Sequence, residues 1–185
     1  YQGFVDALAE AGYKDGENIK IDYQNAQGDQ ATASTIATKL VNDNNDLILA
    51  IATPAAQAVA NITKDIPILV TAVTDPAASG LVASNEAPGG NVSGTSDLTP
   101  VKRQIELLTQ LVPDAVNVAV LYCSSESNSK IQAEIAIEAG TALGLNVFEA
   151  TVSDSNEIQQ VVQSLVGNVD AIYVPTDNII SDGMA

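Results

Sequence analysis

Hydrophobic positions along the chain recur with two different periods, which alternate from the first residues onward. Phe4, Leu8 and Ala11 share one face of a helix that a glycine ends. The stretch IKIDYQNAQ at residues 19–27 then alternates apolar and polar positions as a half-buried strand does. Because a strand normally precedes such a helix in an α/β unit, we expect a further strand ahead of it.

The alternation of helices and strands continues along the rest of the chain. The pattern predicts helices at residues 30–42, 55–62, 100–111, 130–143 and 157–166, and strands at residues 47–52, 66–73, 117–123, 146–152 and 171–175. Strands that alternate with helices over short loops indicate an α/β fold with parallel sheets flanked by helices. A further helix is expected to begin where the chain ends.

A connection rich in Gly, Pro, Asn and Ser separates two sets of these units. Its sequence, ASNEAPGGNVSGTSDLTP, occupies residues 83–100 and lacks the apolar residues of a core. We therefore expect two Rossmann-like lobes, the first at residues 1–94 and the second at residues 95–185.

Composition restricts the chemistry that the chain can perform. Its 23 acidic and 7 basic residues give a net charge of −16, which repels phosphate backbones, so we expect no nucleic-acid partner. The chain has no histidine and one cysteine, which removes the usual zinc ligand, the usual general base and any internal disulfide. We therefore expect no Ser-His-Asp or Cys-His mechanism, no metal and no cofactor.

Polar side chains gather where the predicted strands end. The four turns that follow buried strands are Thr53-Pro54-Ala55, Thr74-Asp75-Pro76, Ser124-Ser125-Glu126 and Thr176-Asp177-Asn178. In parallel α/β sheets, ligands bind beyond the carboxyl ends of the strands, where helix N-termini present free amides. Each turn can instead be a helix cap, since Ser, Thr, Asp and Asn are the preferred capping residues. The opposite loops lack such hydroxyl clusters, which favours a shared ligand crevice.

Two features beside these turns admit a structural interpretation. The apolar run at residues 47–52 is typical of a strand whose two faces are both covered, so we expect helices on both sides of its sheet. Tyr122 ends a strand next to Ser124, and it is either a core tyrosine with a satisfied hydroxyl or a residue that stacks on a ligand.

Five motifs carry a resemblance to a known family. In chain order they are ATPAAQA, TAVTDPAASGLV, GGNVSGTSD, YCSSESNS and YVPTDN. In their order and spacing, the chain resembles the substrate-binding proteins of ABC importers, and more narrowly the group with a type I periplasmic-binding-protein fold that takes up tryptophan or tyrosine. The resemblance implies two lobes joined by a hinge, without the first strand of the first lobe and without the return of the chain to that lobe.

The resemblance also implies a small-molecule ligand, an amino acid, held between the lobes. The residues expected at this cleft are Thr53, Ala55, Ala56, Gln57, Thr74, Asp75, Asp97, Tyr122, Ser124, Ser125, Glu126, Asn128, Thr176, Asp177 and Asn178. We expect the helix N-termini at residues 53–56 and 124–125 to bind the ligand carboxylate. Asp177 is the first candidate for the ammonium group and Asp97 the second, while Tyr122 shapes the side-chain pocket.

The same resemblance implies a role in transport. A protein of this kind captures an aromatic or other apolar amino acid by hinge closure, without catalysis, and delivers it to an ABC permease at the outer face of the cell, as a periplasmic or lipid-anchored protein. Two other interpretations stay open. The effector-sensing half of a transcription regulator shares this two-lobed fold, and a metal-assisted enzyme could use the carboxylates of Asp75 and Asp177.

Overall fold

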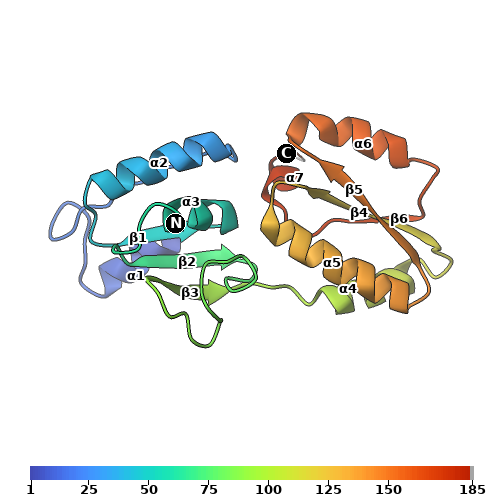
Figure 1. Ribbon diagram of the computed structural model, residues 1–185, viewed down its shortest axis with the longest axis horizontal. Coiled ribbons are helices and arrows are strands. Elements are labelled where there is room, and N and C mark those ends of the chain that lie inside the picture. Colours follow the sequence, from blue (N-terminus) through green and yellow to red (C-terminus); the bar gives the residue numbers. More distant parts are fainter. Residues whose placement is uncertain (184–185) are drawn as a thin grey trace.

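The computed structural model describes residues 1–183 as two groups of helices and strands that lie next to each other (Figure 1). We call residues 1–96 the first lobe and residues 101–183 the second lobe. Each lobe contains one three-stranded parallel sheet, and residues 97–100 connect the two. The predicted α/β fold with parallel sheets flanked by helices is therefore confirmed. The predicted boundary between residues 94 and 95 falls within a strand of the first sheet.

The first lobe consists of helices and strands that alternate as predicted. Its elements are α1 (Gln2–Glu10), α2 (Gln30–Asn42), β1 (Ile48–Ile51), α3 (Thr53–Ala60), β2 (Ile68–Val73) and β3 (Val92–Ser96). The strands lie in the order β1-β2-β3, with Ile68 opposite both Ile48 and Val92. Asp29 begins α2, because its side chain accepts a hydrogen bond from the Thr32 amide at 2.6 Å. Helix α2 has the predicted bounds.

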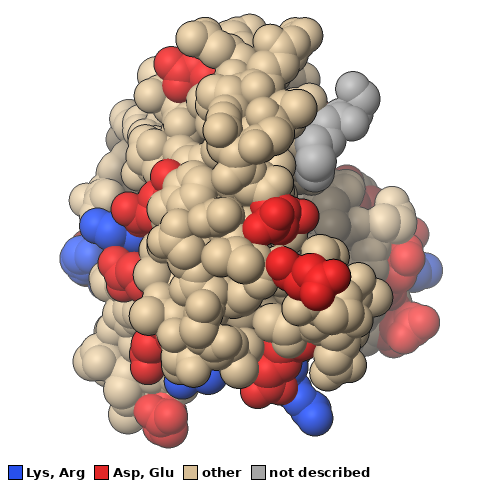
Figure 2. All heavy atoms as spheres, turned by 90° about the vertical axis from the view of Figure 1, so that its right-hand side faces the viewer, with Lys and Arg blue, Asp and Glu red and all other residues tan. Residues whose placement is uncertain are grey.

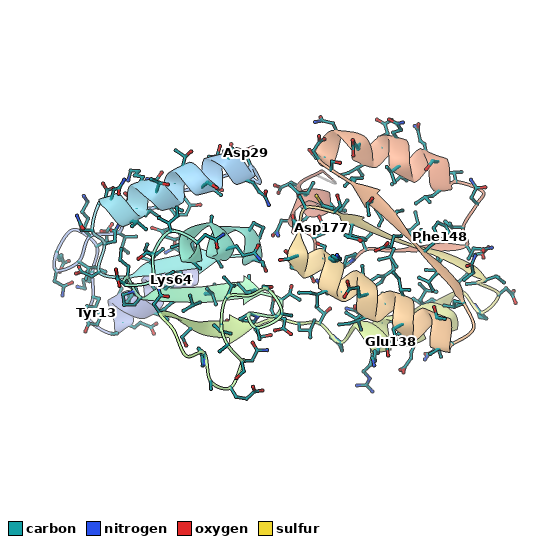
Figure 3. The ribbon with its side chains drawn as sticks, viewed as in Figure 1. Tyr13, Asp29, Lys64, Glu138, Phe148 and Asp177 are labelled. Atoms are coloured by element: carbon teal, nitrogen blue, oxygen red, sulfur yellow. The ribbon has the colours of Figure 1, made fainter. Side chains whose placement is uncertain are left out.

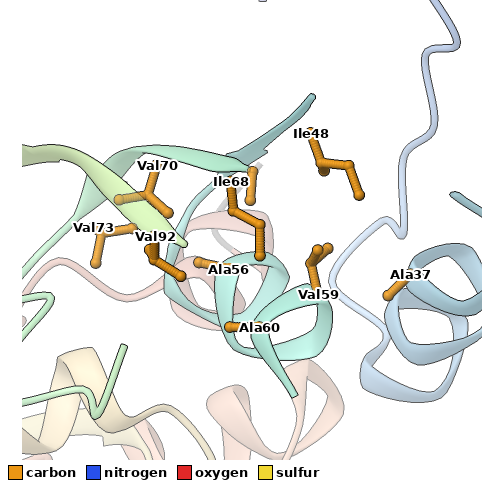
Figure 4. Packing of buried hydrophobic residues seen from close by; sticks show 10 residues of the cluster. Ala37, Ile48, Ala56, Val59, Ala60, Ile68, Val70, Val73 and Val92 are labelled. Atoms are coloured by element: carbon orange, nitrogen blue, oxygen red, sulfur yellow. The ribbon is translucent and has the colours of Figure 1, made fainter. Parts of the chain in front are cut away.

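One face of the first sheet forms the core of its lobe. The buried residues of this core are Ala37, Ile48, Ala50, Ala56, Val59, Ala60, Ile68, Val70, Val73 and Val92, which come from α2, α3 and the three strands (Figure 4). The alternate positions Ile51 and Leu69 are 39% and 37% exposed. The prediction that both faces of this sheet are covered is therefore wrong for the described residues, and α1 has no buried residue.

Residues 19–27 form no strand, contrary to the prediction. Within the described residues this stretch pairs with the rest of the chain through one isolated bridge, between Ile19 and Asp15. The ammonium group of Lys39 on α2 binds the Asp22 carboxylate and holds the stretch in place. A cavity of about 1350 Å³ is lined by this stretch, by α2 and β1, by Pro54 and Ala55 after β1, and by Glu126 and Asn178 of the second lobe. The alternating pattern is that of a strand, but among residues 1–183 no strand pairs with it to form a ladder.

The second lobe is arranged around a central strand. Its elements are α4 (Val101–Leu111), β4 (Asn117–Cys123), α5 (Ser127–Ala142), β5 (Asn146–Val152), a 3₁₀ turn (Ser155–Glu157), α6 (Ile158–Leu165), β6 (Ala171–Tyr173) and α7 (Asn178–Gly183). The strand order is β5-β4-β6. Helices α4 and α5 pack on one face of β4, and α6 and α7 pack on the other. Both faces of this sheet are thus covered, and β4 and β5 have the predicted bounds.

Three differences from the sequence prediction affect the site. Helix α3 begins at Thr53 rather than at residue 55, and α5 begins at Ser127 rather than at residue 130. Strand β3 lies in the predicted connection, where only Val92 is buried, so its five residues have no apolar pattern to reveal them. The earlier helix starts place Thr53, Ser127 and Asn128 in first helical turns.

The surface carries the acidic character of the sequence. Figure 2 shows Asp and Glu side chains across the second-lobe face that is turned to the viewer, with Lys and Arg toward its margins. The net charge of the chain is −16. Within residues 1–183, every helix is too short or too polar to cross a lipid bilayer.

Candidate functional site

The strands of each sheet point toward the other lobe. In Figure 1 the arrowheads of β2 and β3 face the second lobe, and α5 begins at the side of the second lobe that faces the first. The N-termini of α3 and α5 follow β1 and β4 directly, so both lie where the lobes meet. The four polar turns predicted from the sequence follow β1, β2, β4 and β6, as the topological argument expected.

A hydrogen bond joins the two lobes at this point. The side-chain amide of Gln57, on α3, donates through Nε2 to the carbonyl oxygen of Ser79 at 3.0 Å and to Oγ of Ser127 at 3.1 Å. Ser79 follows β2 in the first lobe, and Ser127 is the first residue of α5 in the second. The contact therefore brings together three chain segments that lie after three different strands.

Three buried polar atoms close to this contact in the sequence have no hydrogen-bond partner among the described residues. They are Oγ1 of Thr53, Oγ of Ser79 and Oδ1 of Asn128. Thr53 lies one helical turn before Gln57, and Asn128 follows Ser127 directly. We call Thr53, Gln57, Ser79, Ser127 and Asn128 the junction site. Ser79 and Ser127 were not among the predicted ligand-binding residues, although they belong to the motifs TAVTDPAASGLV and YCSSESNS.

The Glu126 carboxylate organises the second-lobe side of the junction. Although predicted to contact the ligand, it is 3% exposed and accepts hydrogen bonds from Nδ2 of Asn128 at 2.8 Å, Nδ2 of Asn178 at 2.7 Å and the amide of Ile179 at 3.1 Å. These bonds join the start of α5 to the start of α7. Glu126 and Asn178 also line the cavity beside β1, so their contact with a ligand stays a prediction.

Asp177, the first candidate for a ligand ammonium group, is used by the fold itself. Its Oδ2 accepts a hydrogen bond from the Cys123 amide at 2.7 Å, and its Oδ1 accepts one from the Ile180 amide at 2.8 Å. Figure 3 places the residue at the side of the second lobe that is next to the first lobe, yet it is only 5% exposed. Because backbone amides bind both oxygens, Asp177 joins the start of α7 to the end of β4, and its contact with a ligand ammonium group stays a prediction.

Two other predicted residues lie in hydrophobic cores. Tyr122 is 4% exposed in the second-lobe core, and its hydroxyl donates to Oε1 of Glu149 at 2.6 Å. Burial and the hydrogen bond to Glu149 raise the pKa of Tyr122 to about 12. Ala56 is fully buried in the first-lobe core, and its amide donates to the carbonyl of Ala52. The core interpretation of Tyr122 holds, and neither side chain reaches the junction site.

Asp75 shapes the loop that carries Ser79. Its Oδ1 accepts hydrogen bonds from the amides of Ala77 and Ala78, both at 3.1 Å, and from Nδ2 of Asn85 at 3.0 Å. The bonds from Ala78 and Asn85 hold the pKa of Asp75 below its usual value. The carbonyl of Asp75 also accepts the Ser79 amide at 2.9 Å. Asp75 thus fixes the position of Ser79 through its own hydrogen bonds.

Gln132 is a functional candidate that the sequence did not reveal. It is fully buried in α5, where its Oε1 accepts hydrogen bonds from Oγ1 of Thr99 at 3.2 Å and from the amide of Thr176 at 3.3 Å. Its Nε2 donates to the carbonyl of Thr176 at 3.3 Å. Gln132 therefore joins the connection at residues 97–100 to the turn after β6. A glutamine within a helical pattern is usually exposed, so no sequence signal marks this one.

The remaining residues predicted to bind the ligand are either exposed to solvent or located at strand ends near the junction site. Asp97 is exposed directly after β3 and makes no side-chain hydrogen bond or ion pair with any described residue. Ser124 and Ser125 are exposed after β4, where Ser124 donates to the Val152 carbonyl at 3.3 Å. Thr74 is buried at the end of β2, and Ala55 lines the cavity beside β1.

Comparison with known families gives a match along the whole chain. The sequence model of the family described as ABC transporter substrate binding protein matches residues 1–185. The chain is also 52% identical over 183 residues to a tyrosine-binding protein of Clostridioides difficile (strain R20291), covering 99% of this chain and 53% of that protein. The chain thus spans about half the length of this relative.

Two solved structures show the same arrangement of elements. One is an ABC domain in complex with L-Trp from Streptococcus pneumoniae, with a TM-score of 0.93 and 44% identity, covering 100% of this chain and 62% of that one. The other is the ligand-free, open structure of a substrate binding protein with adhesive properties from Clostridium difficile, with a TM-score of 0.64 and 52% identity, covering 99% and 62%. The overall structure thus matches the L-Trp complex better, despite the lower sequence identity.

Proposed function

The chain belongs to the ABC transporter substrate-binding protein family, and from this membership we propose that it captures an aromatic amino acid, tryptophan or tyrosine, between its two lobes for an ABC importer. The name of the tyrosine-binding relative and the L-Trp complex support this ligand class. The proposal concerns the whole protein, since the chain spans 53% of that relative. Capture requires no chemical change in the ligand.

The observation that carries the proposal is the set of unpartnered polar atoms at the junction site. A buried polar group without a hydrogen bond costs about 1–3 kcal/mol, so a ligand that pairs with it gains affinity. The hydroxyls of Thr53 and Ser79 can donate to a carboxylate, and Thr53 lies at the N-terminus of α3, where free amides favour negative charge. Oδ1 of Asn128 can only accept a hydrogen bond, which suits an ammonium group.

We assign the principal ammonium contact to Asp97 in place of Asp177. The Asp97 carboxylate has no partner among the described residues and lies at the start of the connection between the lobes, residues 97–100. Backbone amides, in contrast, bind both oxygens of Asp177. A charge-assisted hydrogen bond between a carboxylate and an ammonium group is about twice as strong as a neutral one. Ser124, Ser125 and Thr74 complete the proposed contacts at the strand ends.

Capture by hinge closure follows from the placement of these groups on both lobes. A ligand that contacts Thr53 and Asn128 together is bound more tightly when the lobes are closed, so binding shifts the population toward the closed form. We propose that a membrane permease recognises this closed form, and that the protein works outside the cytoplasm at the cell surface.

The other two interpretations have less support. Family membership favours the importer over the sensor half of a transcription regulator. The enzyme hypothesis relied on Asp75 and Asp177, whose carboxylates accept hydrogen bonds from backbone amides. Among residues 1–183, no group of three or more His, Cys, Asp or Glu side chains is placed to hold a metal ion.

Calorimetric titration of the full-length protein tests the proposal. We expect L-Trp or L-Tyr to bind with one site per molecule. We expect Asp97→Ala to weaken that binding about tenfold or more, since a hydrogen bond to a charged group contributes about 1.5–3 kcal/mol. Asp65→Ala is the matched control, because Asp65 is an exposed first-lobe carboxylate whose side chain has no partner among the described residues. Failure of the wild-type protein to bind any aromatic amino acid would reject the proposed ligand class.

A further inference from the structure

Within the described part of the chain, the hydrogen bond between Gln57 and Ser127 has no counterpart between the two lobes. Among residues 1–183, it is the one hydrogen bond or ion pair that joins the first lobe, residues 1–96, to the second lobe, residues 101–183. The lobes also approach each other at Gly28, where an added β-carbon would lie 3.2 Å from Oδ2 of Asp182 and 3.5 Å from Cδ1 of Ile179. Figure 3 shows the neighbouring Asp29 at the end of α2 that faces the second lobe.

The first lobe orients the Gln57 amide before the second lobe engages it. The carbonyl of Ser79 can only accept a hydrogen bond, so the nitrogen of the Gln57 side chain must face it. The second N–H of the same group is then directed at Oγ of Ser127. Gln57 is about half-buried and Ser79 is buried, so the amide loses little further conformational freedom when Ser127 arrives.

We propose that Gln57 and Ser127 form a latch that stabilises the closed arrangement of the two lobes. Opening the lobes separates Gln57 from Ser127 but leaves its bond to Ser79 intact, because Gln57 and Ser79 belong to the same lobe. The latch therefore acts on the equilibrium between the open and closed forms of the protein. Ser127 is a positioning residue in this account. Its neighbour Asn128 is placed in the junction site when the latch is closed.

The effect of the latch on ligand affinity rests on the proposed function, whereas its effect on the ligand-free protein does not. One partly buried hydrogen bond contributes enough to change an equilibrium about twofold to tenfold. Loss of the latch should therefore lower the ratio of closed to open molecules by about that factor in the absence of ligand. If the closed form is the minor form without ligand, affinity for a ligand that needs this form falls by the same factor.

The experiment measures the distance between the lobes in the full-length protein by double electron–electron resonance. Spin labels at Thr35→Cys on α2 and Gln160→Cys on α6 report the separation, since both positions are exposed and lie on different lobes. The native Cys123 is fully buried, which protects it from labelling. The variants are Ser127→Ala, Gln57→Ala and the double variant. The matched control is Ser164→Ala, whose hydroxyl bonds only within α6.

We expect Ser127→Ala to lower the ratio of closed to open molecules at least about twofold without ligand, and the double variant to fall no further than Gln57→Ala. Equal distance distributions for Ser127→Ala and Ser164→Ala would overturn the latch. So would additive effects in the double variant. A wild-type protein that binds no aromatic amino acid would reject the proposed function, yet the ligand-free distance distributions would still decide whether the latch exists.

Discussion

The two lobes have the same kind of sheet but differ in how that sheet is covered. In the second lobe every residue of β4 after Asn117 is buried, because α4 and α5 pack on one face and α6 and α7 on the other. In the first lobe the buried core lies on one face, and β1 and β2 alternate between buried and accessible positions. The same apolar sequence pattern thus occurs on a strand with two covered faces and on a strand with one.

The difference extends to the way polar groups are used. The second lobe satisfies its acidic side chains internally, since Glu126 and Asp177 bind the amides that begin α7. In the first lobe, buried Thr53 and Ser79 keep unpartnered hydroxyls, and Ala52 adopts a left-handed φ of 74° just before Thr53. Backbone strain and unpaired polar groups are typical of binding sites and lower the stability of the fold. We therefore infer that binding residues reduce the stability of the first lobe more than that of the second lobe.

Hydrogen exchange should show the largest contrast between the lobes. We expect the amides of β4 to exchange only on global unfolding of the second lobe, because the strand is buried and paired on both sides. The amides of residues 22–26, which donate no hydrogen bond to any described residue, should exchange about a thousandfold faster or more. Mass spectrometry of the 185-residue chain measures both, and equal protection would remove the contrast.

Gly94→Ala should cause the largest loss of stability by a single substitution. A β-carbon at Gly94 would overlap the Val70 carbonyl and lie 2.7 Å from the Val70 amide nitrogen, so β2 and β3 could not pair. We expect about 3 kcal/mol or more of destabilisation in urea unfolding. Gly90→Ala is the matched control, because a β-carbon there meets no atom within 4 Å. A loss at Gly94 no larger than at Gly90 would contradict the observed pairing.

Asp177→Asn should destabilise the second lobe by about 1.5–3 kcal/mol. The substituted amide nitrogen would face either the Cys123 amide or the Ile180 amide, so one buried donor loses its acceptor. Thermal unfolding measures this loss, and titration of the folded variant with ligand should give an affinity close to that of the wild type. A large loss of affinity without a loss of stability would restore Asp177 as the ammonium ligand.

Ala52→Gly should stabilise the first lobe by about 1 kcal/mol. A residue with a β-carbon at φ 74° and ψ 155° is strained by about 1–3 kcal/mol, and glycine relieves this strain. Glycine also raises the entropy of the unfolded chain, which offsets part of the stabilisation. Ala55→Gly, inside α3, is the opposing control and should destabilise by about 1 kcal/mol. Similar losses for both substitutions in urea unfolding would show that Ala52 is unstrained.

The smallest effect concerns the acid sensitivity of the first lobe. The folded pKa of Asp75 lies below its ordinary value of 3.8, so its hydrogen bonds contribute stability above that pH and lose it as the pH falls through the folded value. Asp75→Asn should therefore destabilise the protein at pH 7, while at a pH well below the folded pKa of Asp75 the difference from the wild type should disappear. Urea unfolding at pH 7 and at the acidic pH measures both differences. A difference that does not change with pH would show that the ionised form of Asp75 does not supply this stability.

Prediction from sequence succeeded where local pattern alone decides the structure. The run at residues 117–123 and the helical period at residues 30–42 gave the observed bounds, because β4 is a continuous apolar run and the apolar residues of α2 recur at the helical period. The stretch at residues 19–27 has the pattern of a strand but no adjacent strand, and pairing cannot be read from one segment. β3 was missed because it buries only Val92.

The candidate site was predicted at the level of turns but not of individual atoms. Sequence placed Thr53, Asp75, Glu126 and Asp177 at the ends of strands, as observed. Whether an acidic oxygen meets a backbone amide or stays free depends on packing between distant segments, as for Asp177 and Cys123, which are 54 residues apart. For the same reason no pattern revealed the bond from Gln57 to Ser127, which spans 70 residues.

The most direct test of the account is a crystal structure of the full-length protein with L-Trp or L-Tyr bound. The account predicts that the ligand lies between the N-termini of α3 and α5, with hydrogen bonds to Thr53, Ser79 or Asn128 and its ammonium group beside Asp97. A ligand that contacts only one lobe, without a hydrogen bond to Thr53, Ser79 or Asn128, would contradict it.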